Sequence, residues 1–245
     1  MKDSAFTIKS NIALTESVFE MVLKGDTSEI AGRPGTFVNI RIDGLYLRRP
    51  ISVCDCEGDC LTLVYKVVGK GTEAMSKMSP GTTLDVLTGL GNGYDIKAAG
   101  ENPLLLGGGV GVPPLYYMAK LLIGCGASVS VVLGFNTGKE VFYEEKFRSL
   151  GAEVTVATAD GSYGTKGFVT DALPEKYSYF YTCGPEPMLK AVYRATETDG
   201  EFSFEERMGC GFGACMGCSC KTVTGYKRIC KDGPVLKKEE ILWEK

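Results

Sequence analysis

The sequence predicts a multidomain β and α/β protein, with an antiparallel β-barrel first, a parallel-sheet α/β domain second and a small cysteine-rich domain last. Three observations support this architecture. Short runs of alternating apolar residues separated by turn residues fill the first part of the chain. Continuous apolar strands alternate with helical stretches in the second part, and half of the ten cysteines lie in the third. We expect domains at residues 1–99, 100–204 and 205–245.

The barrel is expected from four runs whose apolar residues occupy alternate or near-alternate positions. These runs are Phe6–Ser10, Val18–Leu23, Phe37–Ile42 and Leu61–Val68. Turn-forming segments such as Gly32–Gly35 and Glu57–Asp59 separate them. Short strands at this spacing are typical of a small antiparallel barrel. One helical interruption, Thr72–Met78, follows a glycine.

The α/β domain is expected after a linker-like segment at residues 98–102. A continuous apolar strand, Pro103–Leu106, leads into a run of glycines. The strands expected after it are Ser128–Phe135, Glu153–Thr158 and Tyr179–Cys183, and the helices are Pro113–Ile123, Glu140–Leu150 and Glu186–Thr198. Buried strands that alternate with helices predict a parallel sheet with helices on both faces.

The composition excludes several kinds of chemistry. The 245-residue chain has no histidine, which removes the usual general base, the histidine-dependent nucleophiles, and histidine-ligated zinc, haem and Rieske clusters. The chain has 27 Lys+Arg and 30 Asp+Glu, a net charge of −3, so no general attraction for nucleic acid or an acidic membrane surface is expected. The N-terminal segment has no long apolar run and no stretch is long enough to span a membrane, so we expect a cytoplasmic protein with reduced thiols.

The cysteine spacing near the end of the chain predicts a [2Fe–2S] cluster. Cys210, Cys215, Cys218 and Cys230 follow the C-x4-C-x2-C…C spacing of plant-type ferredoxins, in which each of two irons takes two thiolates. Glycines in the loop let the backbone pass close to sulfur and direct N–H groups toward it. A disulfide framework conflicts with the expected compartment, and structural zinc usually shows two C-x2-C pairs or histidines, but both stay open. Cys220 is interpreted as a buried or spare thiol.

The glycine run between the first α/β strand and its helix predicts a dinucleotide site. A pyrophosphate docks at such a turn, against bare backbone and the helix N-terminus. Gly109, Gly111 and Pro114 fit G-x-G-x-x-P, so the ordinary Rossmann pattern fails at its third position. Proline is tolerated there because its missing N–H would be unpaired in the first helical turn. A plain strand–helix turn is the alternative.

A second motif follows the last expected parallel strand. Cys183, Gly184 and Pro185 would start a helix at the carboxyl edge of the sheet, where ligands bind in such folds. Taken alone, Cys183 is explained as well by a small buried apolar side chain.

The barrel carries a pair of motifs that together indicate a flavin nucleotide. Arg49 begins an Arg-Pro-Ile-Ser segment and offers a rigid fork for a diphosphate, while Ser52 could hydrogen-bond a flavin ring nitrogen. Gly71 and Thr72, at the start of a short helix, can present N–H and hydroxyl groups to a phosphate. Considered one at a time, Arg49 is explained as well by a surface charge and Ser52 by a turn residue. Their pairing, ahead of a nucleotide-type domain, favours the functional interpretation.

These motifs, in this order, resemble the ferredoxin–NADP reductase superfamily. The segments Glu205–Cys218 and Cys230–Val235 narrow the resemblance to the electron-transfer subunits of NAD-dependent (class 1B) dihydroorotate dehydrogenases, over essentially the whole chain. The resemblance implies an FAD-binding barrel, an NAD-binding domain and a [2Fe–2S] domain. It also implies a separate FMN-containing catalytic partner, usually in an α2β2 heterotetramer.

The resemblance also implies the residues that bind each group. For FAD they are Arg49, Pro50, Ile51, Ser52, Val64, Tyr65, Lys66, Gly71 and Thr72. For the region near NAD they are Gly109, Gly111, Cys183, Gly184 and Pro185, and for the cluster Cys210, Cys215, Cys218 and Cys230. One departure stands out: the chain continues into the cysteine domain where the wider superfamily ends in an aromatic residue that stacks on the flavin.

The implied function is electron transfer in pyrimidine biosynthesis. Electrons from the partner's FMN would pass singly through the cluster to FAD, and a hydride would then pass to NAD+. No catalytic acid or base is then expected in this chain. NAD is favoured over NADP because the loop 136–140 lacks an arginine for a 2′-phosphate, although Lys139 could compensate. Alternatives are the reductase subunit of a bifurcating transhydrogenase, sulfhydrogenase or oxygenase, a non-catalytic redox sensor, and a zinc-stabilised nucleotide-binding protein.

Overall fold

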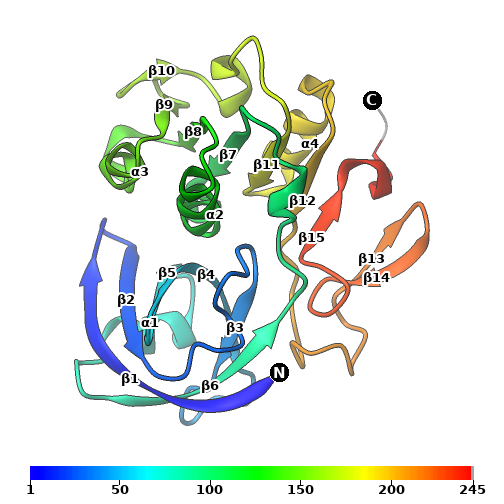
Figure 1. The fold of residues 1–245 in the computed structure, drawn as a ribbon. Helices are drawn as coiled ribbons and strands as arrows, with labels where there is room; N and C mark the ends of the chain where they lie inside the picture. Colours follow the sequence, from blue (N-terminus) through cyan, green and yellow to red (C-terminus); the bar gives the residue numbers. More distant parts are fainter. Residues whose placement is uncertain (244–245) are drawn as a thin grey trace.

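The first part of the chain forms a closed antiparallel barrel. A computed structural model describes residues 1–243, so the last two residues of the expected third domain lie outside it. The barrel order is β1-β2-β5-β4-β3-β6 (Figure 1). The strands are β1 (Lys2–Ala13), β2 (Val18–Lys24), β3 (Phe37–Ile40), β4 (Arg49–Glu57), β5 (Cys60–Lys66) and β6 (Thr83–Leu90). Alternate residues such as Met21 and Leu23 fill its core, which confirms the barrel.

The one helix of the barrel region, α1 (Lys70–Ser76), begins two residues earlier than expected. Its Met75 is buried in the barrel core. The Asn11 side chain of β1 donates to the Met75 and Met78 carbonyl oxygens at 2.9 and 3.0 Å. These bonds hold the end of the helix against β1.

The second part is a mostly parallel seven-stranded sheet of order β10-β9-β8-β7-β11-β12-β15. The strands are β7 (Leu104–Gly108), β8 (Ser130–Phe135), β9 (Glu153–Thr158), β10 (Thr165–Lys166), β11 (Phe180–Cys183), β12 (Gly200–Ser203) and β15 (Val235–Lys237). The helices are α2 (Pro113–Gly124), α3 (Glu144–Leu150) and α4 (Glu186–Ala195). Helices α2 and α3 pack on one face and α4 on the other, as predicted.

Helix α3 starts four residues later than the sequence suggests. Tyr143, just before it, has a positive φ of 70°, which breaks the helical pattern. Its hydroxyl donates to the buried Glu20 carboxylate on β2, which also accepts from Lys146. The Tyr143 hydroxyl is in turn bonded by the Cys54 thiol of β4 at 3.2 Å. This polar contact between barrel and α/β domain overrides the local helical signal.

The third part does not stand apart from the rest of the molecule. It contains the hairpin β13 (Ser219–Thr222) and β14 (Gly225–Arg228), and then adds β15 antiparallel to β12 at the edge of the α/β sheet. Its buried Cys218 and Ile229 share a core cluster with Phe37, Leu87 and Leu90 of the barrel. A segment of about 40 residues has too little apolar area for a core of its own, which agrees with that shared packing.

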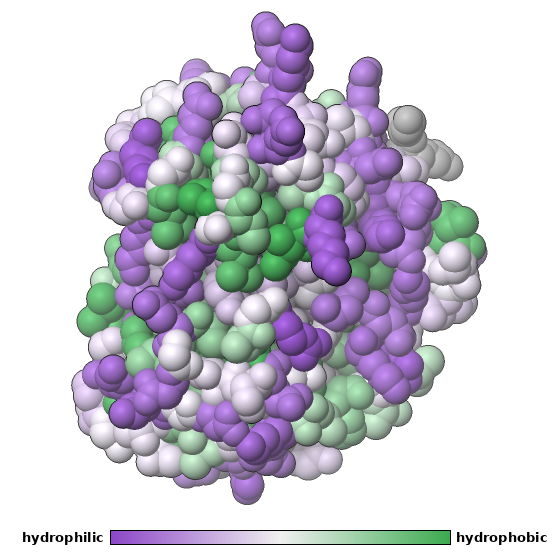
Figure 2. Space-filling model, viewed as in Figure 1, coloured by the Kyte–Doolittle hydropathy of each residue, from purple (hydrophilic) through white to green (hydrophobic). Residues whose placement is uncertain are grey.

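The surface is mostly polar on the face drawn in Figure 1. Figure 2 shows hydrophobic residues gathered across the middle of this face, between the α/β domain and the barrel. Within residues 1–243, no helix is long and apolar enough to cross a membrane.

Candidate functional site: three adjoining cofactor regions

The glycine run ends at the point where the α/β sheet changes direction. From β7 the chain moves to β8 on one side, and from its neighbour β11 it moves to β12 on the other. In such sheets the carboxyl ends of these two strands form the ligand crevice. Gly107 and Cys183 lie opposite one another in the β7–β11 register. The structure therefore brings both nucleotide motifs to the same edge of the sheet, where such folds have their ligand crevice.

The crevice requires glycine at two positions. Gly109 has a φ of +51°, in the left-handed region. A Cβ added to Gly111 would lie 2.2 Å from the carbonyl oxygen of Cys183, so no other residue fits without moving the backbone. Helix α2 begins at Pro113, directly after this turn. The close approach leaves bare backbone at the helix start, as a pyrophosphate site needs.

Cys183 itself is the last residue of β11, at the carboxyl edge of the sheet. Burial raises the pKa of its thiol to about 12, so the group is neutral near pH 7. A neutral thiol is a poor nucleophile. The arrangement suits a packing contact with a bound ring rather than covalent chemistry.

The two motifs of the barrel also meet. Arg49 begins β4, and a Cβ on Gly71 of α1 would lie 2.0 Å from the Arg49 Nε atom. The guanidinium therefore packs directly on the first turn of the helix. Its Nη1 atom donates to the carbonyl oxygens of Leu47 and Arg48. No carboxylate pairs with Arg49 among the residues described.

The neighbouring Arg48 has a structural role instead. Its two terminal nitrogens donate to both carboxylate oxygens of Asp85 at 2.9 and 3.1 Å, and one of them also reaches Asp3 at 3.2 Å. Arg48 is therefore neutralised by carboxylates, whereas the charge of Arg49 has no carboxylate partner among the described residues. A guanidinium without a carboxylate partner, beside bare backbone, suits a diphosphate.

Two other residues expected at the flavin, Tyr65 and Thr72, have side chains that bond to other parts of the chain. The Tyr65 side chain points into the barrel, where its hydroxyl donates to Asn11 at 2.9 Å and its ring stacks on Phe19. Burial raises the pKa of Tyr65 to about 12. The Thr72 hydroxyl accepts the Val68 N–H at 2.9 Å and closes the start of α1. In this structure both side chains are already hydrogen-bonded within the protein.

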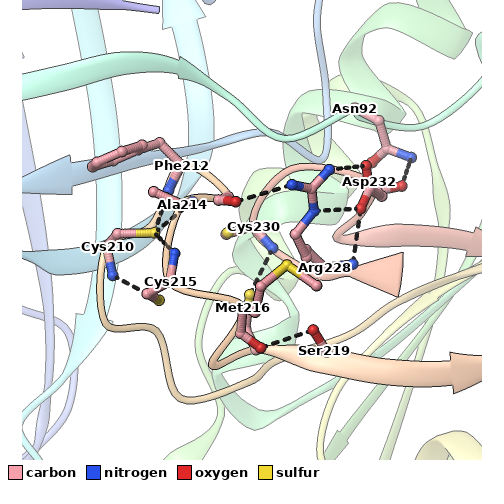
Figure 3. Close-up of polar contacts among 12 residues, drawn as sticks. Asn92, Cys210, Phe212, Ala214, Cys215, Met216, Ser219, Arg228, Cys230 and Asp232 are labelled. Atoms are coloured by element: carbon pink, nitrogen blue, oxygen red, sulfur yellow. Dashed lines mark hydrogen bonds and ion pairs between the residues drawn. The ribbon is translucent and has the colours of Figure 1, made fainter. Parts of the chain in front are cut away.

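The four cysteines of the predicted cluster form two pairs, of which Figure 3 labels Cys210, Cys215 and Cys230. Cys210 and Cys215 are in contact in the exposed loop, where the Cys210 N–H donates to the Cys215 sulfur at 3.4 Å. Cys218 and Cys230 are buried, and the Cys230 N–H donates to the Cys218 sulfur at 3.4 Å. Within residues 1–243, no three potential ligands converge on one point. Two pairs are the donor set that two irons with two thiolates each require.

The two pairs differ in their electrostatic surroundings. Burial opposes ionisation of Cys210, but backbone N–H groups directed at its sulfur outweigh burial and lower its pKa to about 6. The donors are the N–H groups of Phe212, Ala214 and Cys215, at 3.5, 3.2 and 3.4 Å. For Cys230, burial and then the Cys218 sulfur raise the pKa to about 12. Cys210 is thus prepared as a thiolate, and a bound metal would deprotonate Cys230.

A clamp that the sequence did not reveal holds these segments together. The Arg228 guanidinium donates to both carboxylate oxygens of Asp232, at 2.9 and 3.2 Å, and to the Gly213 carbonyl oxygen of the cysteine loop at 2.9 Å (Figure 3). The Asn92 side chain donates to the Val235 carbonyl oxygen at 2.7 Å. The clamp therefore brackets Cys230. The sequence signal that could have indicated this clamp is the oppositely charged pair of Arg228 and Asp232, with Cys230 midway between them.

The remaining cysteine of this region, Cys220, lies in β13, the extended segment expected for it, and is partly buried. Its thiol donates to the neighbouring Lys221 carbonyl oxygen at 3.8 Å, and the side chain packs against the core cluster that contains Cys218 and Cys230. It stays outside both pairs.

Comparisons with known proteins agree with this division. A protein-family model described as the iron-sulfur cluster binding domain of dihydroorotate dehydrogenase B matches residues 205–242, and one described as an oxidoreductase NAD-binding domain matches residues 105–194. The protein named dihydroorotate dehydrogenase B (NAD(+)), electron transfer subunit, of a Geobacillus species is 43% identical over 99% of both chains. Its namesakes in Bacillus caldolyticus and Fusobacterium nucleatum are 44% and 43% identical, over 96% of this chain and 97% and 96% of their own.

Solved structures show the same architecture. A chain of the NADH-dependent reduced ferredoxin-NADP oxidoreductase, studied for flavin-based electron bifurcation, is 32% identical with a TM-score of 0.88, over 97% of this chain and 90% of that one. The ferredoxin reductase in carbazole 1,9a-dioxygenase is 21% identical with a TM-score of 0.67, over 79% and 64% of the two chains. The second likeness concerns the fold alone.

Proposed function

Because the chain belongs to the family of electron transfer subunits of dihydroorotate dehydrogenase B, we propose that it carries electrons from a dihydroorotate dehydrogenase catalytic subunit to NAD+ in pyrimidine biosynthesis. The family expected from the motifs is confirmed by relatives that match nearly the full chain. One observation supports the activity most strongly. The cysteines of the segment matching the family's iron-sulfur domain form two pairs, beside a barrel and a crevice suited to two nucleotides.

Each proposed group has residues suited to hold it. Arg49 and Gly71 would bind the FAD diphosphate, the turn at Gly109 and Gly111 would receive the NAD pyrophosphate, and the four cysteines would hold a [2Fe–2S] cluster. When bound, the cluster supplies one-electron transfer, and the flavin links it to the two-electron chemistry of NAD. The chain's own part is to bind, orient and shield these groups.

The partner is proposed from the same family membership. An electron transfer subunit implies a catalytic subunit, which we propose to contain FMN and to assemble with this chain as an α2β2 heterotetramer in the cytoplasm. The chain has no histidine, and the partly buried Cys183 is a neutral thiol. The base that acts on dihydroorotate is therefore assigned to the catalytic subunit.

The test begins with the content of the anaerobically purified chain. We expect about one FAD, two irons and two sulfides per chain. Cys215→Ser should lose the cluster and abolish NAD+ reduction driven by dihydroorotate and the catalytic subunit, while NADH still bleaches the flavin in part. Cys220→Ser, a cysteine outside both pairs, is the matched control. Full partner-driven NAD+ reduction by Cys215→Ser would remove the cluster from the path, and one zinc with no iron would refute the cluster.

A second function is favoured by one observation. The chain of the NADH-dependent reduced ferredoxin-NADP oxidoreductase matches this chain at a TM-score of 0.88. A subunit of that kind would exchange electrons with a ferredoxin-linked partner. The two functions separate in one assay: reduced ferredoxin or dihydroorotate, each with the co-purifying partner, is tested as the electron donor for NAD+ reduction.

A further inference from the structure

One strand pair of the barrel joins the proposed flavin site to the cysteine loop. In the β3–β4 register, Phe37 lies opposite Ser52 and Asn39 lies opposite Pro50. Residues directly opposite in an antiparallel pair share one face of the sheet. The alternate residues, Val38 and Ile51, pack toward the barrel core. Pro50 and Ser52 of the flavin motif therefore share an outer face with Asn39.

The cysteine loop lies on that same outer face. The Asn39 Nδ2 atom donates to the Cys210 carbonyl oxygen at 3.3 Å. Gly211 has a φ of +77°, and a Cβ on it would lie 2.3 Å from Asn39 Nδ2. Phe37 packs in the core cluster that contains Cys218. The face that carries Pro50 and Ser52 of the flavin motif is thus in direct contact with the start of the cysteine loop.

Asn39 is not explained by packing or stability. The residue is 1% exposed, and its Oδ1 atom is buried without a hydrogen-bond partner. Turning the amide over would set Oδ1 against the Cys210 carbonyl oxygen, so the orientation with Nδ2 on Cys210 is the favourable one. A buried acceptor left unpaired costs stability, and an apolar side chain of similar size would avoid that cost. The Nδ2 donor is therefore the part of this side chain that is hydrogen-bonded, and its partner is the Cys210 carbonyl oxygen.

We propose that Asn39 is a positioning residue that holds the Cys210 end of the cysteine loop on the strand pair carrying the flavin motif. It would thereby fix the orientation of the cluster relative to the flavin. This inference rests on the proposed function, because it assumes that both groups bind where their motifs lie. Asn39 contacts the loop backbone and is not assigned to either ligand set.

The primary test is Asn39→Leu, which keeps the side-chain size but removes both the donor and the unpaired acceptor. We expect unchanged or higher stability, full iron content and native bleaching of the flavin by NADH. The electron paramagnetic resonance spectrum of the reduced cluster should broaden or shift. Electron exchange between flavin and cluster in stopped flow should slow about fivefold, the population change that one ordinary hydrogen bond supports.

A matched control is available on β1. The Ser4 Oγ atom is likewise buried without a partner, on a barrel strand that pairs with β6. Ser4→Ala removes an unpaired oxygen without touching the cysteine loop, so it should leave the cluster spectrum native. Asn39→Met, which fills the space with a flexible apolar side chain and has no donor toward Cys210, gives a second measurement if Asn39→Leu does not fold. A side chain that merely fills space would leave the spectrum native in Asn39→Met.

A native spectrum and native flavin–cluster exchange in a fully loaded Asn39→Leu protein would overturn the proposal. The spectrum needs the loaded chain but not its partner, so it remains informative if dihydroorotate proves to be the wrong donor. A protein with no activity toward the catalytic subunit and a shifted Asn39→Leu spectrum would count against the proposed function alone. A native protein that binds no iron would overturn both.

Discussion

The buried carboxyl of Glu201 should make stability depend on pH near neutrality. Glu201 lies in β12, at the junction between β11 and β15 in the α/β sheet, and it is 3% exposed. Its Oε2 atom accepts the Asp95 N–H at 2.9 Å. Burial raises the pKa of this carboxyl from 4.5 to about 7. The folded protein therefore keeps a proton there that the unfolded chain has lost.

The magnitude follows from that difference in proton binding. Proton binding by Glu201 makes its full contribution to the free energy of unfolding below the unfolded-state pKa, and this contribution is lost as pH rises to the folded-state pKa. The free energy of unfolding should fall by about 1.4 kcal/mol per pH unit, or about 2 kcal/mol between pH 5.5 and 7, and then level off. Glu201→Gln, which can still accept from Asp95, should lack this fall and be the more stable protein at pH 8.

Urea denaturation followed by fluorescence of Trp243, the chain's only tryptophan, is the suitable assay. Its ring lies 5.9 Å from that of Phe202, the neighbour of Glu201 in β12, so it reports on this junction. Exposed Glu239→Gln serves as the control. Other titrating groups cancel in the difference between native protein and variant. A difference that stays constant from pH 5.5 to 8 would refute the assignment of a raised pKa to Glu201.

Three further changes have expected outcomes. Gly111→Ala places a Cβ against the Cys183 carbonyl oxygen, so the apparent Kd for NADH should rise roughly tenfold or more. A titration of the flavin with NADH that matches the native protein would contradict this. Gly71→Ala displaces the Arg49 guanidinium, which is flexible, so the FAD-to-protein ratio should fall while circular dichroism stays native; full FAD content would count against the site. Asp232→Asn weakens the fork with Arg228, so iron should be lost faster to a chelator, and an unchanged half-life would show that the clamp does not hold the cluster.

Local signals were sufficient for much of the fold. Alternation in the barrel strands and the glycines after β7 act through neighbours in sequence, so they could be interpreted without tertiary contacts. Strand β12 has only four residues and includes the charged Glu201, and β10 has two, so neither carries an apolar pattern. The pairing of β15 with β12 joins distant segments, which no local pattern encodes.

The residues of the candidate site also fall into two groups, those that the sequence displays and those that only the fold reveals. Cysteine spacing and glycine turns are constrained by the ligand's own geometry, so the sequence displays them. In the sequence, Asn39 is an ordinary strand residue, and its role depends on Gly211, which packs against it in the fold. The role of Arg228 likewise depends on its 2.9 Å hydrogen bond to the Gly213 carbonyl oxygen. Tyr65 shows the converse, because a residue carried over from the family turns its hydroxyl into the barrel. Such roles arise from packing between segments far apart in the chain.

The register of β12 and β15 gives the cysteine region a closed neck. Ser203 lies opposite Val235, and just beyond this pair the Phe204 N–H donates to the Pro234 carbonyl oxygen at 2.9 Å. The intervening lobe therefore leaves the sheet and returns to it at the same place. The two ends of the lobe are therefore fixed by a ladder that also holds the nucleotide site, so conformational freedom gained by the lobe when its metal is lost is not transmitted through its ends. The packing of Cys218 and Ile229 against the barrel is the route by which such a change would reach the flavin-binding part of the chain.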